Sequence, residues 1–158
     1  MEEVADNLFV GAERSCRSVR RDDDWAVVHA CKHPCHNDKC GNLPQGHPDY
    51  LVHRDGSDLY LNMVDMDRKQ KHQFMDPMIS ETLEFIDEHI DSAQVLIHCN
   101  QGQSRSPSLA MLYLAKRDKH VSNENYDQAS EEFRELYPHF NPGRGIHLYL
   151  QDYWHQLE

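Results

Sequence analysis

The sequence predicts an α/β fold: one domain in which a central, mainly parallel sheet of about five strands is flanked by helices on both faces. Short apolar runs alternate along the chain with segments of helical periodicity, as is typical of strands joined by helices. The length of 158 residues is near the usual size of one domain and is enough to bury a core. No internal repeat, low-complexity segment or long linker divides the chain. We therefore interpret residues 1–158 as a single domain.

Three helices are predicted from apolar residues that recur every three or four positions. The first begins at Asp76-Pro77, because proline fits the first turn of a helix. The second follows Ser122 and ends before Pro138, which cannot continue a helix. The third lies near the end of the sequence. We interpret the three apolar stripes as core-facing surfaces: Ile79, Leu83, Ile86 and Ile90; Tyr126, Ala129, Phe133 and Leu136; Ile146, Leu150, Tyr153 and Leu157.

Charge and cysteine content argue against several classes of protein. The formal net charge of −11 disfavours nucleic acid and anionic membranes as partners. No apolar run approaches the roughly 20 residues of a membrane-spanning helix, and the acidic N-terminus is unlike a signal peptide. Five cysteines, an odd number, favour a reducing compartment over a disulfide scaffold. We expect a cytoplasmic, monomeric protein that binds neither nucleic acid nor membranes.

The most informative segment is His98-Cys99-Asn100-Gln101-Gly102-Gln103-Ser104-Arg105-Ser106. It follows the apolar run 95–97 and precedes a helical pattern at 109–113. A strand, a tight loop and a helix N-terminus can hold a phosphate, because the loop N–H groups point inward and the helix dipole adds partial positive charge. A cysteine in such a loop is expected to be a thiolate at neutral pH. The segment therefore predicts a thiolate nucleophile that attacks a phosphoryl group.

This segment resembles the signature loop of the cysteine-dependent protein tyrosine phosphatases, in their dual-specificity branch. The Cys–Arg spacing alone is a weak signal, but the added His, Gly and Ser residues make the combination specific. The resemblance extends over nearly the whole chain and is weakest at residues 31–50. It implies strands at 6–11, 25–30 and 59–63, and a turn at 141–146 that opens the last helix.

The resemblance and the residue chemistry together assign roles within the segment. Cys99 is expected to attack phosphorus in line and to form a phosphocysteine intermediate. Arg105 presents a planar guanidinium to two phosphate oxygens, and Gly102 permits a sharp turn around the anion. Ser106 is expected to help the thiolate leave in the second step, and His98 to orient the loop by hydrogen bonds. The residues expected to bind the phosphate are Asn100, Gln101, Gly102, Gln103, Ser104 and Arg105.

Members of this family take the proton for the leaving group from an aspartate on a separate loop. Asp65 and Asp67 both follow the strand expected at 59–63. Asp67 matches the family's position relative to the nucleophile better, and we favour it as the general acid. Asp65 remains the alternative, because geometry decides such a role.

A second unusual feature is the density of Cys and His residues between positions 29 and 47. Zinc suits thiolates and imidazoles, and its candidate ligands are Cys31, Cys35 and Cys40. Their spacing lacks the second close pair of a zinc ribbon, so we favour a polar, His-rich loop without metal. Some members of the family carry at the position of Cys31 a cysteine that traps the oxidised nucleophile as a disulfide. The alternative for Cys31 is a small core residue.

The substrate class follows from the loop side chains. Asn100, Gln101 and Gln103 are uncharged, whereas relatives that act on inositol lipids tend to carry lysine there. We therefore expect phosphoprotein or phosphopeptide substrates, with phosphotyrosine, phosphoserine and phosphothreonine all able to enter a shallow pocket, and no cofactor. The alternatives are a phosphatase of inositol lipids or RNA 5′ ends, and a phosphate-binding or metal-binding module without turnover. The complete set of catalytic residues favours an enzyme.

Overall fold

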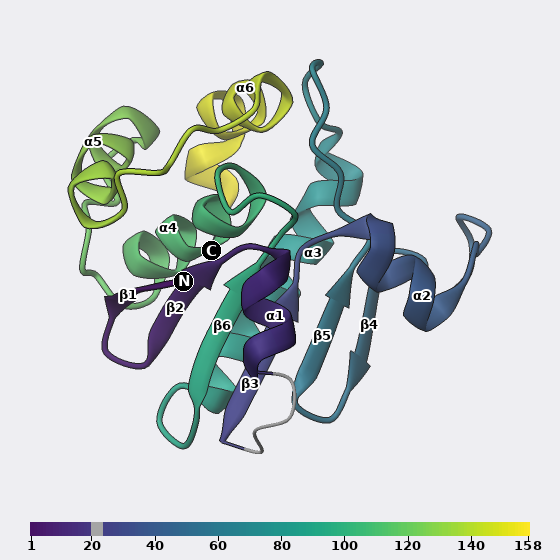
Figure 1. Cartoon of the computed structure of the whole chain (residues 1–158). Coiled ribbons are helices and arrows are strands. Elements are labelled where there is room, and N and C mark those ends of the chain that lie inside the picture. The colour runs from purple at the N-terminus through teal and green to yellow at the C-terminus, as the bar shows by residue number, and fades with distance from the viewer. Residues whose placement is uncertain (20–23) are drawn as a thin grey trace.

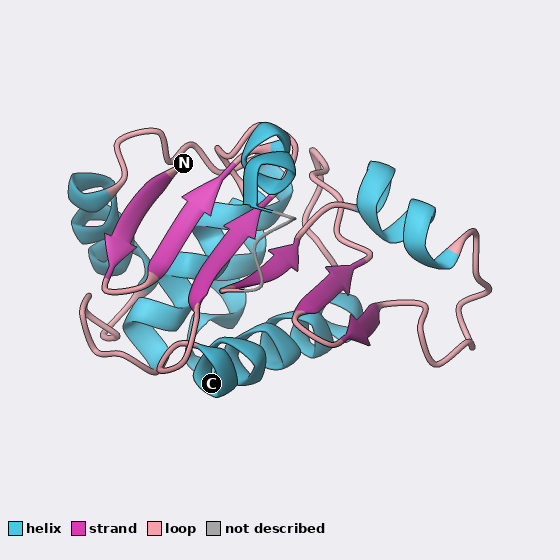
Figure 2. Cartoon of the chain, turned by 60° about the horizontal axis from the view of Figure 1, so that its bottom comes forward, coloured by secondary structure: helices cyan, strands magenta, loops and turns pink. Residues whose placement is uncertain are grey.

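A mixed sheet forms the centre of the computed structural model, which describes residues 1–19 and 24–158. Within these residues its strands are β1 (Glu2–Ala5), β2 (Leu8–Gly11), β3 (Trp25–His29), β4 (Val52–Asp55), β5 (Asp58–Leu61) and β6 (Gln94–His98). They lie in the order β1-β2-β6-β3-β5-β4 (Figure 1). The four central strands run parallel, and β1 and β4 pair antiparallel with their neighbours at the two edges (Figure 2). The expected α/β fold with a mainly parallel sheet is confirmed.

The register of the central strands brings three loops to one edge of the sheet. Gly11 at the end of β2 and His29 at the end of β3 both lie opposite His98 at the end of β6. Ligands of parallel α/β sheets bind at this carboxyl edge. Because Cys99 follows His98 directly, the expected nucleophile lies where the loops after β2, β3 and β6 meet.

Two antiparallel edge strands were not predicted, so the described sheet has six strands where about five were expected. The strand expected at 6–11 begins only at Leu8, because Asp6 and Asn7 form the turn of a hairpin between β1 and β2. Asn7 has a φ of 66°, which asparagine tolerates better than most residues. Its N–H donates to the Glu3 carboxylate at 3.0 Å. Strand β4 was missed because it carries no apolar alternation and is largely exposed.

The helices cover the two faces of the sheet unequally. They are α1 (Glu13–Val19), α2 (Asn37–Cys40), α3 (His72–His89), α4 (Arg105–Lys116), α5 (Tyr126–Leu136) and α6 (Arg144–Tyr153), with short turns η1 (Lys32–His36) and η2 (Trp154–Gln156). The helical layer of α3 to α6 packs over one face and encloses the main core, while α1 packs on the opposite face (Figure 1). There Val19, Val27 and Leu96 form a small second cluster. Helices on both faces are therefore confirmed. In the described part of the chain, no helix is long and apolar enough to cross a membrane.

Helix α3 begins four residues before the predicted start at Asp76, so that Pro77 lies inside it. Its first turn is held by tertiary contacts that the local pattern does not reveal. His72 Nδ1 lies 2.8 Å from the Tyr149 hydroxyl, and the His72 ring stacks on Tyr153 with centroids 4.3 Å apart. These contacts with α6 outweigh the backbone hydrogen bond that Pro77 cannot donate.

The two C-terminal helices follow the predicted stripes. Tyr126, Ala129 and Phe133 are buried in α5, which begins after a capping Asn125 and ends at Leu136 before Pro138. The side chain of Asn125 accepts from the N–H of Gln128 at 2.8 Å, as an N-cap should. In α6 the stripe ends sooner than expected, because Leu157 lies beyond η2, although its side chain is buried.

Candidate active site

The expected phosphate loop connects the end of β6 to the start of α4. Cys99 is only 2% exposed, and its N–H donates to the carbonyl of Gly11 at 3.4 Å. The preceding carbonyl, of His98, accepts from the N–H of Ala30 at 2.9 Å. Contacts with the ends of β2 and β3 therefore fix the nucleophile candidate from both sides.

Ser106 lies beside the sulfur of Cys99. Its Oγ is 3.2 Å from Cys99 Sγ and donates to the Gly11 carbonyl at 3.1 Å. A hydroxyl has one proton to donate, and rotation of the O–H bond transfers that hydrogen bond from the carbonyl to the sulfur. The Ser106 side chain is buried in the first turn of α4, so it stays within reach of a thiolate.

Arg105 reaches across the mouth of the loop. One terminal nitrogen donates to the carbonyl of Met63 at 3.0 Å, and the other to the side-chain oxygen of Asn100 at 2.7 Å. Among the described residues, its Nε is buried and has no hydrogen-bond partner. A guanidinium carries five N–H groups, so three remain to bind an anion in the cavity that Arg105 lines.

Gly102 supplies the turn of the loop. Its φ is +72°, and a Cβ there would come within 3.0 Å of the Gly11 carbonyl oxygen. The hydroxyl of Tyr137 donates to the Gly102 carbonyl at 2.6 Å and holds the turn from the side of α5. The positive φ and the lack of space for a side chain both favour glycine at this position, as expected.

The loop forms one wall of a cavity of about 400 Å³. The opposite wall is the segment before α6, which is tied to the loop by hydrogen bonds from Gly143 N–H to Ser104 Oγ at 2.8 Å and from Asn141 N–H to the Gln103 carbonyl at 2.7 Å. The cavity is lined by Asp65, Cys99, Asn100, Gln101, Gln103, Ser104, Arg105, Asn141, Pro142 and Gly143.

The two candidate acids differ in position. Asp65 lines the cavity, and its carboxylate lies so close to Gly143 that any side chain at position 143 would overlap it. Asp67 is not among the cavity-lining residues. The carbonyl of Asp67 accepts from the Arg144 guanidinium at 3.2 Å. The side chains of Asp65 and Asp67 are both exposed, so the cavity lining is what separates them. The structure therefore brings Asp65, not Asp67, to Cys99 and Arg105.

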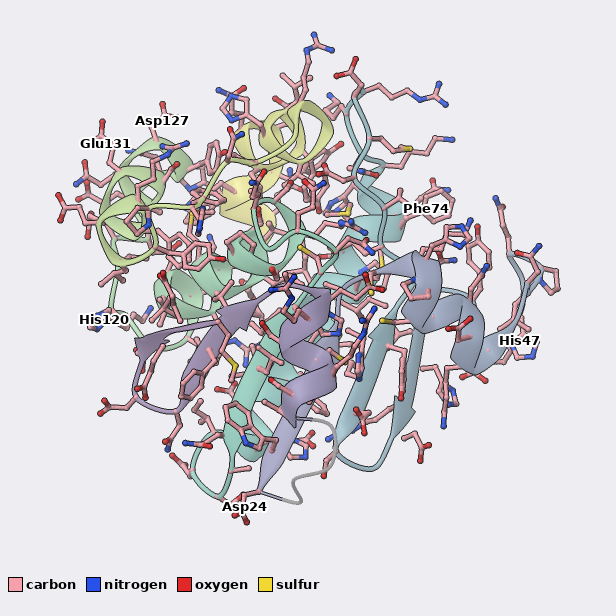
Figure 3. The ribbon with its side chains drawn as sticks, viewed as in Figure 1. Asp24, His47, Phe74, His120, Asp127 and Glu131 are labelled. Atoms are coloured by element: carbon pink, nitrogen blue, oxygen red, sulfur yellow. The ribbon has the colours of Figure 1, made fainter. Side chains whose placement is uncertain are left out.

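The Cys and His residues between positions 29 and 47 do not form one cluster. Cys31 and Cys35 are hydrogen-bonded; this bond lowers the pKa of the Cys31 thiol and raises that of Cys35. Within the described residues, the group that could hold a metal with them includes His98 and not Cys40. Cys31, Cys35 and Cys40, the ligand set considered as the alternative to a loop without metal, are therefore not brought together. His47 lies on the loop after α2, at the periphery of the molecule (Figure 3).

A chain of close polar contacts behind the loop was not foreseen. His29 Nε2 lies 2.7 Å from Asp58 Oδ1, and His29 Nδ1 lies 2.7 Å from His98 Nε2. His98 Nδ1 in turn lies 3.3 Å from the carbonyl oxygen of Cys99. The expectation that His98 orients the loop by hydrogen bonds fits this geometry. A histidine at the end of a buried strand was the available signal for His29, but its partner lies 69 positions away.

Comparisons with known proteins identify the family of this chain. The family model described as "Dual specificity phosphatase, catalytic domain" matches residues 36–155. The "MAP kinase phosphatase with leucine-rich repeats protein 1" of Dictyostelium discoideum is 25% identical over 135 residues, which are 85% of this chain and 14% of that protein. The chain thus spans a small part of that relative.

Two solved structures share the fold. A leucine-rich repeat and phosphatase domain containing protein from Entamoeba histolytica has a TM-score of 0.66 at 16% identity, covering 98% of this chain and 90% of the other. The PTP-2 phosphatase of Cydia pomonella has a TM-score of 0.64 at 21% identity, covering 96% and 88%. The family model covers all the residues named above as lining the cavity, and the resemblance expected from the sequence is confirmed. This chain belongs to the dual-specificity phosphatase catalytic-domain family.

Proposed function

We propose that this chain hydrolyses phosphate monoesters on proteins, on tyrosine and on serine or threonine, through a phosphocysteine intermediate. The observation that carries this proposal is the meeting of three groups in one place. The Cys99 sulfur, the Ser106 hydroxyl and the Arg105 guanidinium converge at the phosphate loop, with a buried Nε of Arg105 that has no partner among the described residues.

In the first step, the Cys99 thiolate attacks phosphorus opposite the ester oxygen. A P–S bond forms while the P–O bond to the leaving group breaks, and the leaving oxygen takes a proton from an aspartic acid. Arg105 and the loop N–H groups hold the other phosphate oxygens, where negative charge is stabilised throughout the transfer.

We assign the proton donor to Asp65. Its carboxyl lines the cavity that contains Cys99 and lies close to Gly143. The loop that carries it is held to α6, since the Gly145 N–H donates to the Met66 carbonyl at 2.9 Å. Asp67, which the sequence favours, lies outside the cavity lining, although the side chains of both aspartates are exposed. The position of Asp65 supports this assignment.

In the second step, water attacks the phosphocysteine and the P–S bond breaks. The aspartate that gave up its proton accepts one from the water, and the sulfur leaves as a thiolate. The Ser106 hydroxyl, 3.2 Å from that sulfur, donates its hydrogen bond to the departing thiolate. This stabilisation supports a role for Ser106 in the second step and not in the first.

Three observations support a protein substrate. Asn100, Gln101 and Gln103 present no positive charge for the additional phosphates of an inositol lipid. The Dictyostelium relative is named a MAP kinase phosphatase, a name that describes a protein substrate for that relative. The chemistry of the loop and the acidic body of the chain both favour a phosphopeptide over a polyphosphorylated lipid or an RNA end.

The test is hydrolysis of para-nitrophenyl phosphate and of phosphotyrosine, phosphoserine and phosphothreonine peptides, without added metal. We expect turnover that is abolished by Cys99→Ser, while binding of vanadate persists, because a serine is not ionised but the loop N–H groups remain. Folded protein that binds vanadate but hydrolyses none of these substrates would be a phosphate-binding module. Turnover by Cys99→Ser would remove Cys99 from the mechanism.

A further inference from the structure

A buried cluster of thiols and imidazoles lies directly behind the phosphate loop, on the α1 side of the sheet. It combines Cys16 from α1, His29 from β3, His98 from β6 and Cys35 from η1. Cys16, His29 and His98 are 4%, 1% and 0% exposed, and Cys35 is half-buried. His29 Nδ1 lies 2.7 Å from His98 Nε2 and 3.5 Å from Cys16 Sγ, and Cys35 Sγ lies 4.0 Å from His98 Nε2.

Outer hydrogen bonds determine which nitrogen of each ring carries a proton. The Cys99 carbonyl can only accept, so His98 Nδ1 must be the donor of that bond. The Asp58 carboxylate likewise accepts from His29 Nε2. Two neutral rings oriented in this way direct the lone pairs of His29 Nδ1 and His98 Nε2 at one another across 2.7 Å. Two facing lone pairs repel, and a cation beside them removes the repulsion.

A proton and a metal ion both satisfy this requirement, and the neighbouring sulfurs distinguish them. A proton shared between two imidazoles has no need of thiols, whereas a soft divalent metal binds thiolate and imidazole together. Cys16 and Cys35 flank the pair of rings from two different elements. They also line, with His29, a cavity of about 320 Å³ through which an ion can enter.

We propose that Cys16, His29, His98 and Cys35 bind a zinc ion. Two of the outer partners are those that a zinc site uses to orient its histidines, a carboxylate on one ring and a backbone carbonyl on the other. This site is distinct from the set of Cys31, Cys35 and Cys40 considered from the sequence. Zinc binding at this site does not depend on the proposed phosphatase activity.

Cys16, His29 and His98 already hold their ligand atoms within 4.8 Å of one another, whereas Cys35, which the structure groups with Cys31 and His98, must move to complete a tetrahedral set. Zn–N bonds of about 2.0–2.1 Å and Zn–S bonds of about 2.3 Å place a sulfur and a nitrogen roughly 3.6 Å apart, and two nitrogens roughly 3.3 Å apart. The separation of Cys16 Sγ and His29 Nδ1, 3.5 Å, already matches. The two nitrogens must separate from 2.7 Å, and Cys35 Sγ must approach from 4.0 Å.

An ion at this position would brace the active-site loop from behind. It would fix His98, which directly precedes the nucleophile and whose Nδ1–H contacts the carbonyl of Cys99. It would also link α1, β3, β6 and η1, which leave or approach the carboxyl edge of the sheet. We therefore assign the ion a structural role, with His98 as its connection to the loop.

The test uses the full chain, reduced and freed of metal, with Cys99→Ser as background so that the nucleophile cannot bind the metal. Cobalt(II) serves as the probe, because tetrahedral thiolate coordination gives sulfur-to-metal charge-transfer bands. We expect these bands to saturate at one ion per chain and zinc to displace the cobalt. Asp58→Asn should weaken affinity about 10- to 100-fold, and Cys16→Ser or Cys35→Ser by more. Cys40→Ser, the matched control in α2, should leave it unchanged.

Several results would overturn the proposal. One is a protein that binds no stoichiometric cobalt and shows a doubly protonated imidazole in its nitrogen NMR spectrum, which would put a proton in place of the metal. Another is retention of the bands in both Cys16→Ser and Cys35→Ser, or their loss in Cys40→Ser. Circular dichroism of each metal-free variant checks the fold. Cys35→Ser alters a half-buried side chain, so the test stands even if Cys16→Ser fails to fold.

Discussion

At the scale of single residues, two aspartates separated by one position have different surroundings. Both are exposed, but Asp65 lines the cavity of the nucleophile, whereas Asp67 lies outside that lining and contacts Arg144 through its backbone carbonyl. An alignment to the family's spacing favours Asp67, because such an alignment follows the sequence and not the direction of a side chain. The contact of Asp65 with Gly143 depends on a segment that lies far along the chain.

Asp65→Asn should lower turnover about 10²- to 10⁴-fold with an alkyl phosphate, whose basic leaving group needs a proton. The loss should shrink with an activated aryl phosphate, which departs unprotonated. Asp67→Asn is the matched control, since it removes the same charge from the same loop and should retain most of the activity. Initial rates for both variants on both substrates check this, and the opposite pattern would return the role to Asp67.

The positions of Cys31 and Cys99 after adjacent strands predict that the two can form a disulfide. His29 and His98 are register partners, so Cys99, which follows His98, and Cys31, two positions after His29, leave the same edge of the sheet. Peroxide should convert the Cys99 thiolate to a sulfenic acid, and attack by the Cys31 thiolate should then form a disulfide and release hydroxide. Peptide mapping after mild peroxide should find Cys99 joined to Cys31, with reducing agent restoring activity.

The control for this disulfide is Cys40→Ser, which should not affect it, whereas Cys31→Ser should let Cys99 proceed to the sulfinic acid. Cys31 is also hydrogen-bonded to Cys35, so a disulfide between these two cysteines is the competing product. A Cys31–Cys35 disulfide with Cys99 left unpaired would contradict the prediction.

At the scale of elements, local sequence patterns predicted those helices, strands and loops whose structure depends on residues close in sequence. The strand, loop and helix around Cys99 could be predicted, because an apolar run, a glycine and a helical stripe follow one another within 94–116. The pairing of His29 with His98 and the wall formed by Gly143 could not, since they depend on strand register and on the docking of α6. Strand β1 and the start of α3 were missed for the same reason.

Pro77 lies inside α3, where tertiary contacts outweigh the local preference, and this placement has a measurable effect on stability. It is exposed and lies in the second turn, where its missing N–H removes a hydrogen bond to the carbonyl of Gln73. Pro77→Ala should therefore raise the free energy of unfolding by about 1–3 kcal/mol, the proline penalty less the entropy regained by the unfolded chain. Urea denaturation checks this. An unchanged or lower stability would mean that the entry of α3 is adapted to proline.

At the scale of the whole molecule, the C-terminal segment is fastened to the end of α4. Lys116 Nζ donates to the Trp154 carbonyl at 2.6 Å and lies 4.4 Å from the centre of the indole ring, while Trp154 is fully buried. Arg117 next to it forms ion pairs with Glu84 and Asp87 of α3. One turn of α4 thus holds both α3 and η2, so the charge state of Lys116 affects the stability of the whole helical layer.

Burial lowers the pKa of Lys116 from its ordinary 10.5 to about 8. Between these values the unfolded chain holds a proton that the folded chain has lost, so this group makes stability rise with pH across that window. Below about 8 both states are charged, and the unfavourable contribution stays constant. The free energy of unfolding of the wild type, relative to Lys116→Met, should therefore increase from neutral pH towards 10.5.

Buried tyrosines with raised pKa values, such as Tyr126 and Tyr137, are present in both proteins and cancel in the difference. Lys39→Met is the control, because the hydrogen bond to Asp55 raises the pKa of exposed Lys39 and places its effect above this window. Urea titrations over the pH series measure both differences, and a flat or falling difference for Lys116 would show that its ammonium is not desolvated in the folded protein.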